Sequence, residues 1–114
     1  MSVSRQRRYL CPVDVTLSVI NGKWKPLILF HLKSAPRRFS ALQAVLPNVS
    51  HKVLTQQLRE LEAAGLVHRL RSRNGANVTY EMTEFGQTLK PSLTALANWG
   101  RKNHEAIGVE LDWD

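Results

Sequence analysis

The fold class that this sequence predicts is mainly α-helical, with one small β-hairpin. Two short segments with helical apolar spacing are separated by a three-residue turn, Pro47-Asn48-Val49. Two strand-like segments follow directly, with Arg73-Asn74-Gly75 between them. A helix pair of this kind followed by a hairpin predicts a winged helix-turn-helix, in which the hairpin is the wing.

Capping and turn residues set the bounds of the expected helices. Pro12 suits the first helical turn, where its missing N–H costs nothing. Ser40 with Gln43 fits a capping box, and Ser50 is a favourable N-cap. Gly65 fits the left-handed residue that ends a helix. We therefore expect helices at about 12–20, 24–32, 40–46, 50–64 and 83–102.

The last of these helices carries more apolar surface than a thin core requires. It should begin at the N-cap Thr83 and continue, with a kink, past Pro91. The first helix offers it an apolar partner face, so the sequence predicts a dimeric fold, an isologous homodimer. The expected interface residues are Val13, Leu17, Leu89, Leu93, Leu96 and Trp99.

The register of the hairpin depends on its turn. A two-residue Asn74-Gly75 turn would pair Leu70 with Thr79 and mix apolar and polar side chains on each face. A three-residue turn pairs Leu70 with Val78 and collects the apolar side chains on one face, so we expect this register. Arg69 and Arg71 then point outward, and Arg73 lies at the tip.

The helix at 50–64 has two distinct faces. At about 100° per residue, Leu54, Leu58 and Leu61 lie on the core side, with Lys52 and Gln56 opposite. Such polar side chains can read base edges or grip phosphates, although any solvated helix also has a polar face. The expected DNA contacts are Ser40, Ser50, His51, Lys52, Thr55, Gln56, Arg59, Arg71 and Arg73.

The charge balance favours a polyanionic partner, and double-stranded DNA is the one we expect. The chain of 114 residues has 16 Lys and Arg against nine Asp and Glu, a net charge of +7. Residues 1–102 hold all 16 cations and five of the acids, which gives them +11. Each phosphate that such a surface neutralises releases counterions. The chain thus divides into a basic arm (1–10), one domain (11–104) and an acidic tail (105–114).

Other classes of function find little support in the sequence. It has no Gly-x-Ser-x-Gly, no phosphate-binding loop and no His-Glu-x-x-His, and its four histidines are scattered. We therefore expect no enzyme, no cofactor and no metal site. No segment approaches the ~20 apolar residues that cross a bilayer, and the first ten residues do not resemble a signal peptide. The expectation is a soluble, cytoplasmic protein without membrane contacts.

The single cysteine, Cys11, excludes a disulfide within one chain but not between two chains. It precedes Pro12, at the expected N-cap of the first helix, where the helix dipole and Arg7 or Arg8 favour a thiolate. The alternative is a small buried hydrophobe, which is typical of free cysteines. Cys11 is thus a candidate for redox sensing, with an oxidant or a small-molecule electrophile as its partner.

Several stretches together carry a family resemblance. They are Cys11-Pro12-Val13, Gly22-Lys23-Trp24, Leu27-Ile28-Leu29, Arg37-Arg38-Phe39-Ser40, the run from Leu46 to Leu61, Gly65-Leu66-Val67, the run from Val78 to Gly86, and Trp99-Gly100. With these stretches, residues 10–103 resemble the HxlR-type winged-helix transcriptional regulators, distant relatives of the MarR type. The wing departs from the family pattern, because 73–77 lacks the usual prolines; it should be tighter and more basic.

The resemblance implies a homodimer in which the first and last helices pack across the two-fold axis. It also implies a recognition helix in the major groove and a wing near the minor groove. Many members have a cysteine at the place of Cys11, and several use it to sense oxidants or electrophiles.

The sequence therefore predicts a sequence-specific transcriptional regulator that binds a pseudo-palindromic operator as a homodimer. Its control would come from modification of Cys11 or from a ligand at the dimer interface. Two alternatives stay open: a winged helix that binds proteins, and a nucleoid-type DNA binder without sequence preference.

Overall fold

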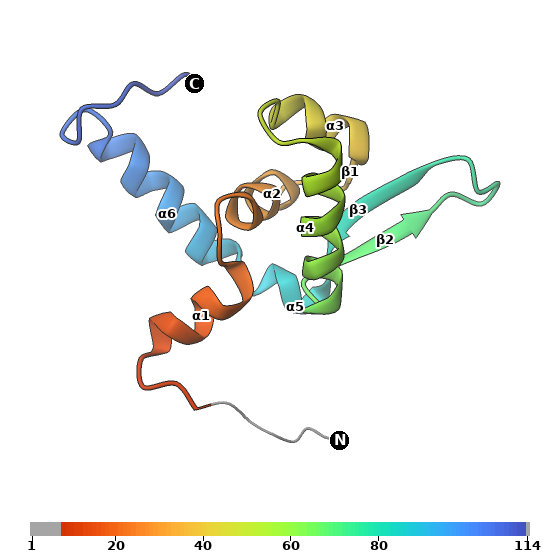
Figure 1. Ribbon diagram of the computed structural model, residues 1–114, viewed down its shortest axis with the longest axis horizontal. Coiled ribbons are helices and arrows are strands. Elements are labelled where there is room, and N and C mark those ends of the chain that lie inside the picture. Colours follow the sequence, from red (N-terminus) through yellow and green to blue (C-terminus); the bar gives the residue numbers. More distant parts are fainter. Residues whose placement is uncertain (1–7, 114) are drawn as a thin grey trace.

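The computed structural model describes residues 8–113, and within them it confirms the predicted mainly α-helical winged helix-turn-helix (Figure 1). Most of the expected basic arm, residues 1–7, lies outside the described residues, as does Asp114. The elements are α1 (Pro12–Ile20), α2 (Trp24–Leu32), β1 (Arg37–Arg38), α3 (Phe39–Val45), α4 (His51–Ala63), β2 (Val67–Arg71), β3 (Val78–Met82), α5 (Glu84–Gln87) and α6 (Lys90–Asn103).

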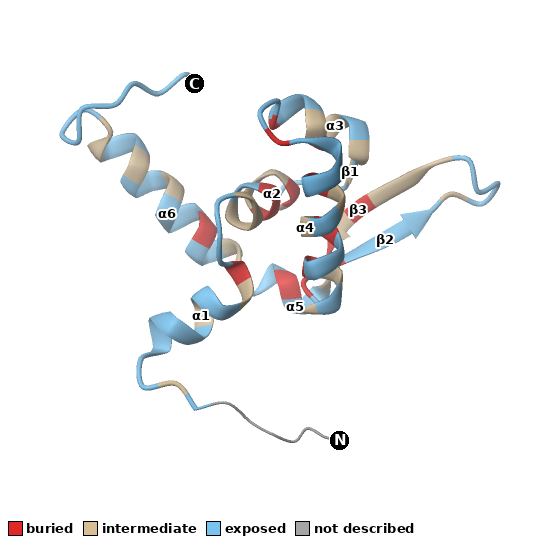
Figure 2. Cartoon of the chain, viewed as in Figure 1, coloured by how far each residue is buried: buried red, intermediate tan, exposed pale blue. Residues whose placement is uncertain are grey.

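The core forms around α2, which lies between α4 and α6 (Figures 1 and 2). Ile28 and Leu29 are fully buried, as the apolar run in this helix predicts. Leu54, Leu58 and Leu61 of α4 are buried in the same cluster, which leaves the opposite side of α4 in solvent. No helix among residues 8–113 is long and apolar enough to cross a membrane.

Local capping predictions are confirmed at three sites. The Val53 N–H donates to Ser50 Oγ at 3.1 Å at the start of α4. The Gly86 N–H donates to Thr83 Oγ1 at 2.8 Å at the start of α5. Gly65, with φ of +78°, ends α4 in the left-handed region, where a side chain would be strained.

The prediction for Ser40 was wrong, because α3 begins one residue earlier and Ser40 is not its N-cap. Arg38 pairs with Thr79 in the sheet, so its backbone is extended and the helix starts directly after it. The side chain of Gln43 is also used differently. Its amide donates to the carbonyls of Leu46 and Val49 beyond the end of α3.

The predicted hairpin register was also wrong. Arg69 pairs with Tyr80 and Leu70 with Thr79, the register that the shorter turn implied. The sheet has the order β1-β3-β2, so β3 is paired on both sides. Arg69 therefore shares the face of the buried Tyr80 and does not simply point outward. A charged side chain is tolerated on this face because the guanidinium of Arg69 reaches Glu62 of α4, with Nε 3.6 Å from Oε1.

The turn itself is longer than either expectation. The Ser72 N–H donates to the Asn77 carbonyl at 2.8 Å, which leaves residues 73–76 as the loop. Asn74 Oδ1 accepts from Ser72 Oγ and from the Ala76 N–H, at 2.7 Å and 3.0 Å. These polar contacts replace the apolar pairing on which the register prediction relied.

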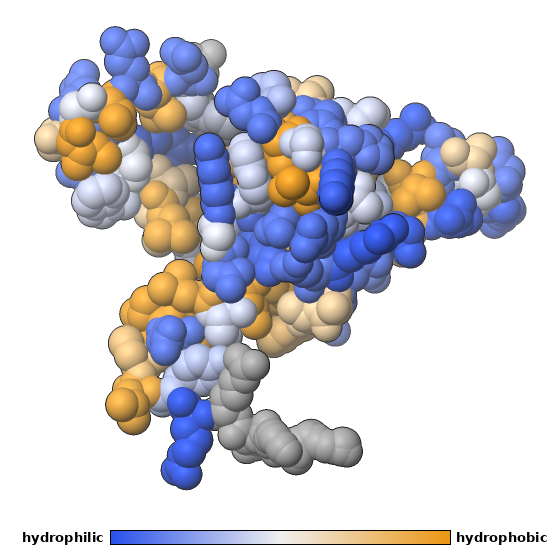
Figure 3. All heavy atoms as spheres, in the orientation of Figure 1, coloured by the Kyte–Doolittle hydropathy of each residue, from blue (hydrophilic) through white to orange (hydrophobic). Residues whose placement is uncertain are grey.

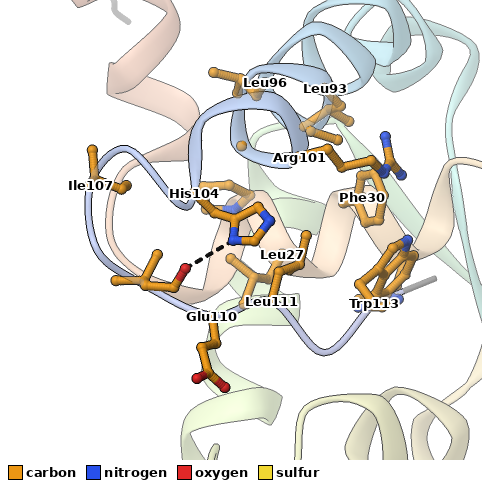
Figure 4. A pocket seen from close by; sticks show the side chains of 15 residues that line it. Leu27, Phe30, Leu93, Leu96, Arg101, His104, Ile107, Glu110, Leu111 and Trp113 are labelled. Atoms are coloured by element: carbon orange, nitrogen blue, oxygen red, sulfur yellow. Dashed lines mark hydrogen bonds between the residues drawn. The ribbon is translucent and has the colours of Figure 1, made fainter.

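The expected single C-terminal helix is divided in two. After α5 the chain turns, and α6 begins at Lys90 with Pro91 in its first turn, where no N–H is needed. The chain then folds back after α6, and the ring of Trp113 packs edge-on against Phe30 of α2, with centroids 5.5 Å apart (Figure 4).

Candidate nucleic-acid interface

The turn between α3 and α4 is held by hydrogen bonds from both sides. The Val49 N–H donates to the Leu46 carbonyl at 3.2 Å, and the Gln43 amide bridges the carbonyls of these same two residues. Because Leu46 and Val49 are buried, the turn is anchored in the core. The angle between α3 and α4 is thus set by contacts within the chain. Sequence reasoning missed this role of Gln43, since it matched a capping box instead.

The outer face of α4 is polar and open to solvent. Lys52, Gln56 and Arg59 are exposed, on the side opposite the buried leucines of this helix. Hydrophilic side chains dominate the surface over α4 in Figure 3. An exposed helix with amide and cationic side chains has the width and chemistry to enter a major groove.

The first turn of α4 also holds side chains that are already engaged. His51 is exposed, and its ring lies 4.5 Å from that of Phe39. Thr55 Oγ1 donates to the His51 carbonyl at 2.8 Å, so this half-buried hydroxyl is directed to its own helix. Ser50 serves as the N-cap, and Ser40 is exposed on α3. Of the predicted DNA contacts, Ser50 and Thr55 thus already make hydrogen bonds to the backbone of α4. The side chains of Lys52, Gln56 and Arg59 are exposed.

A carboxylate that the sequence analysis did not select lies beside Gln56. Gln56 Nε2 donates to Glu60 Oε2 at 3.2 Å, and Lys25 Nζ of α2 lies 2.7 Å from Glu60 Oε1. The hydrogen bond from Lys25, followed by that from Gln56, lowers the pKa of Glu60. The spacing of Gln56 and Glu60 on one helix could have revealed their contact, but only the tertiary fold places Lys25 there.

The wing extends away from the body beside α4 (Figure 1). Arg71 and Arg73 are both exposed, but they are not equivalent. Arg71 Nη1 donates to the Gly75 carbonyl at 3.3 Å, which ties this guanidinium to the loop. Arg73 lies in the loop itself. The structure thus places basic side chains on two neighbouring elements, α4 and the wing.

The model of the HxlR-like helix-turn-helix family matches residues 19–107 of this chain. The chain belongs to this family. It is therefore a transcriptional regulator with a helix-turn-helix DNA-binding fold.

Similar proteins support the same assignment. The HTH-type transcriptional regulator YybR of Bacillus subtilis is 41% identical over 98 residues, covering 85% of this chain and 78% of YybR. YkvN of the same organism is 45% identical over 95 residues, covering 82% and 80%. The redox regulator HypR in its reduced form has a TM-score of 0.80 at 40% identity, covering 85% and 97%. The reduced form of YodB from B. subtilis has a TM-score of 0.70 at 28% identity, covering 82% and 94%.

The HxlR-like chain also exposes a second, apolar region on α1 and α6. α1 buries only Ile20, and Leu17 is 50% exposed. Leu96 and Trp99 of α6 are each 59% exposed, and Figure 3 shows hydrophobic side chains gathered over α1. The other predicted interface residues differ in burial. Val13 is exposed, Leu89 is half-buried, and Leu93 is only 2% exposed, within the chain's own core.

Cys11 is exposed at the N-cap of α1 of the HxlR-like protein, and its thiol is free. Its carbonyl accepts from the Asp14 N–H at 3.0 Å, while its side chain makes no capping bond. Cys11 is thus not part of the hydrophobic core of its own chain. Among residues 8–113 no three His, Cys, Asp or Glu side chains lie together as a metal site would require.

Proposed function

We propose that this HxlR-like protein binds a pseudo-palindromic DNA operator with sequence specificity, as a homodimer. The observation that carries the proposal is the exposed polar face of α4, opposite its buried leucines and beside a basic wing. In this proposal Gln56 contacts base edges, while Lys52, Arg59, Arg71 and Arg73 contact phosphates or the minor groove. The N-terminus of α4 with Ser50 and His51, and Ser40 of α3, lie against the DNA backbone.

The homodimer is supported by the exposed apolar side chains of α1 and α6. Large exposed apolar side chains that gather on one element, as over α1, are typical of an interaction site. An isologous pairing through these helices would present two α4 helices to one duplex. Two such helices read half-sites about 34–36 Å apart, one turn of DNA. Because the two subunits are related by a two-fold axis, the operator should be pseudo-palindromic.

Control through Cys11 is the regulatory part of the proposal. The supporting observations are the exposed thiol at the start of α1 and the likeness to HypR, which is described as a redox regulator. With one cysteine per chain, oxidation can produce a disulfide between chains, a mixed disulfide with a small thiol, or a sulfenic acid. Alkylation by an electrophile is a further route. Each of these products would lie at the start of α1, which is part of the proposed dimer interface.

Selection of bound genomic fragments, followed by titration with the selected operator and with random DNA, tests the proposal. Gln56→Ala is expected to weaken operator binding by about 1–3 kcal/mol and to leave binding to random DNA unchanged. Gln87→Ala removes an exposed glutamine of α5, which is outside the proposed DNA-binding surface, and is the matched control. Equal losses of Gln56→Ala on both DNAs would show that this residue only positions the backbone.

The same titrations separate the alternatives. Binding to random DNA that matches binding to any selected fragment would indicate a nucleoid-type protein. DNA binding that is weak and does not fall as salt rises would indicate a winged helix that binds proteins, since phosphate contacts release counterions.

A further inference from the structure

A cavity of about 540 Å³ lies between α2, α6 and the C-terminal tail (Figure 4). It is on the side of α2 that faces α6, away from the proposed DNA-binding surface of α4 (Figure 1). Sites for small molecules typically have volumes of roughly 300–1,000 Å³ and mostly apolar walls. The volume is thus suited to a ligand of one or two rings.

The tail forms a defined wall of this cavity. Gly108, with φ of +79°, reverses the chain after α6, and the Val109 N–H donates to the His104 carbonyl at 3.0 Å. His104 Nδ1 lies 2.8 Å from the Val109 carbonyl. Further along, the ring of Trp113 lies 5.5 Å from Phe30 and 5.8 Å from His31. Aromatic packing and the turn together hold the tail against α2.

The polar groups around this apolar space are few and differ in charge. Arg101 lines the cavity from α6, and one of its nitrogens donates to Asn98 at 2.9 Å, which leaves other N–H groups free. The Glu110 carboxylate points away from the cavity in Figure 4. Because a carbonyl can only accept, the Nδ1 atom of His104 carries a proton, and the Nε2 atom of a neutral ring is an acceptor. Arg101 is therefore the group suited to an anion.

We propose that this cavity binds a small aromatic carboxylate. Its rings would lie among Leu27, Phe30 and Trp113, and its carboxylate would pair with Arg101. A guanidinium matches a carboxylate in geometry and forms charge-assisted hydrogen bonds with it. All the lining residues belong to one chain, so the proposal depends neither on DNA binding nor on the operator. Leu96, which lines the cavity, also belongs to the proposed dimer interface, so the test includes the oligomeric state.

Gly100 offers a way to fill the cavity without disturbing the backbone. It lines the cavity from α6, and a Cβ built there would meet no atom within 4 Å beyond its neighbours and the nearby backbone of α6. In Gly100→Leu the new side chain enters the open space that a ligand would use. Ala95→Leu adds the same side chain at an exposed position of α6 that does not line the cavity, and is the matched control.

The experiment titrates the full chain with naphthalene-2-carboxylate and with the uncharged 2-naphthylmethanol, by calorimetry. We expect one site per chain and at least about tenfold tighter binding of the carboxylate, a difference that Arg101→Gln removes. Gly100→Leu should weaken binding of both compounds by at least about tenfold, and Ala95→Leu should leave it unchanged. Deletion of residues 109–114, which removes the tail wall, should also abolish binding and does not depend on the folding of Gly100→Leu.

Three results would overturn the proposal. The first is the absence of saturable binding to the parent chain. The second is equal affinity for the carboxylate and the alcohol, or binding that neither Gly100→Leu nor the tail deletion changes. The third is a solution mass that falls by half in Gly100→Leu but not in Ala95→Leu, which would make the cavity part of a subunit interface.

Discussion

Lys25 Nζ of α2 lies 2.7 Å from Glu60 Oε1 of α4, so an ion pair joins the central core helix to the helix with the exposed polar face. The side chain of Lys25 is only 11% exposed, and its ammonium also donates to Asn21 Oδ1 at 3.3 Å. The second oxygen of Glu60 accepts from Gln56. One carboxylate thus connects the core to a side chain that we propose to read DNA.

Glu60→Gln is expected to reduce discrimination between operator and random DNA, because position 60 then has one acceptor oxygen where Lys25 and Gln56 now use two. In a double-mutant cycle, the loss from Gln56→Ala should be about threefold to tenfold smaller when Glu60 is already Gln. Fluorescence anisotropy with both DNAs measures the cycle. Glu62→Gln is the control, since Glu62 contacts Arg69 instead. Additive effects of Gln56→Ala and Glu60→Gln would show that Glu60 does not position Gln56.

Arg73→Gln is expected to flatten the salt dependence of DNA binding by about one unit of slope, the contribution of one phosphate contact. Arg71→Gln should act similarly, and should also loosen the loop that Arg71 contacts at the Gly75 carbonyl. The measurement is log Kd against log salt concentration. Arg69→Gln is the control, because Arg69 is directed to Glu62. A slope that neither wing arginine changes would place the wing away from DNA.

Trp99→Asp and Leu17→Asp are each expected to convert the proposed dimer into monomers, since a charge would enter its apolar interface of α6 and α1. Light scattering at micromolar concentration measures the mass. Phe85→Asp is the matched control, because Phe85 is at least as exposed, at 61%, but lies on α5. A parent chain that is already a monomer under these conditions contradicts the proposed assembly.

Oxidant is expected to change operator affinity in the parent chain and to have no effect in Cys11→Ser. The physical reason is that any product at Cys11 adds bulk or a bond at the start of α1, close to the proposed interface. Operator titrations with and without diamide, alongside the intact mass of the protein, measure both affinity and modification. Restoration of the parent's affinity by a thiol reductant is the control. A response that survives in Cys11→Ser would leave Cys11 without a sensing role.

Acidification is expected to destabilise the fold through His31. Burial, together with the positive charge of Arg37, lowers the pKa of His31 below its ordinary value of 6.5. The unfolded chain then binds the proton first, so the free energy of unfolding is highest above pH 6.5 and falls as pH drops through this range. His31→Phe keeps a ring against Phe30 and Trp113 but cannot titrate. Urea unfolding at several pH values should give a flatter dependence in this variant, and identical curves would contradict the prediction.

Much of the fold follows from interactions between residues that are close in the chain. The N-caps Ser50 and Thr83 and the helix end at Gly65 are set by hydrogen bonds or by backbone geometry within a few residues. Helical periodicity likewise separates the buried leucines of α4 from the exposed Lys52, Gln56 and Arg59, which are the part of the candidate interface on the outer face of this helix.

Contacts between distant segments decided the remaining features. The hairpin register depends on β1 pairing with β3 and on the reach of Arg69 to Glu62, and apolar patterning of the hairpin includes neither. Ser40 is not the N-cap of α3, because Arg38 pairs with Thr79 in the sheet and the helix begins directly after it. Lys25, the partner of Glu60, is distant from it in the sequence, and Trp113 is likewise distant from Phe30, against which it packs. Local propensity carries no information on which distant groups meet, because that choice follows from how the whole core packs.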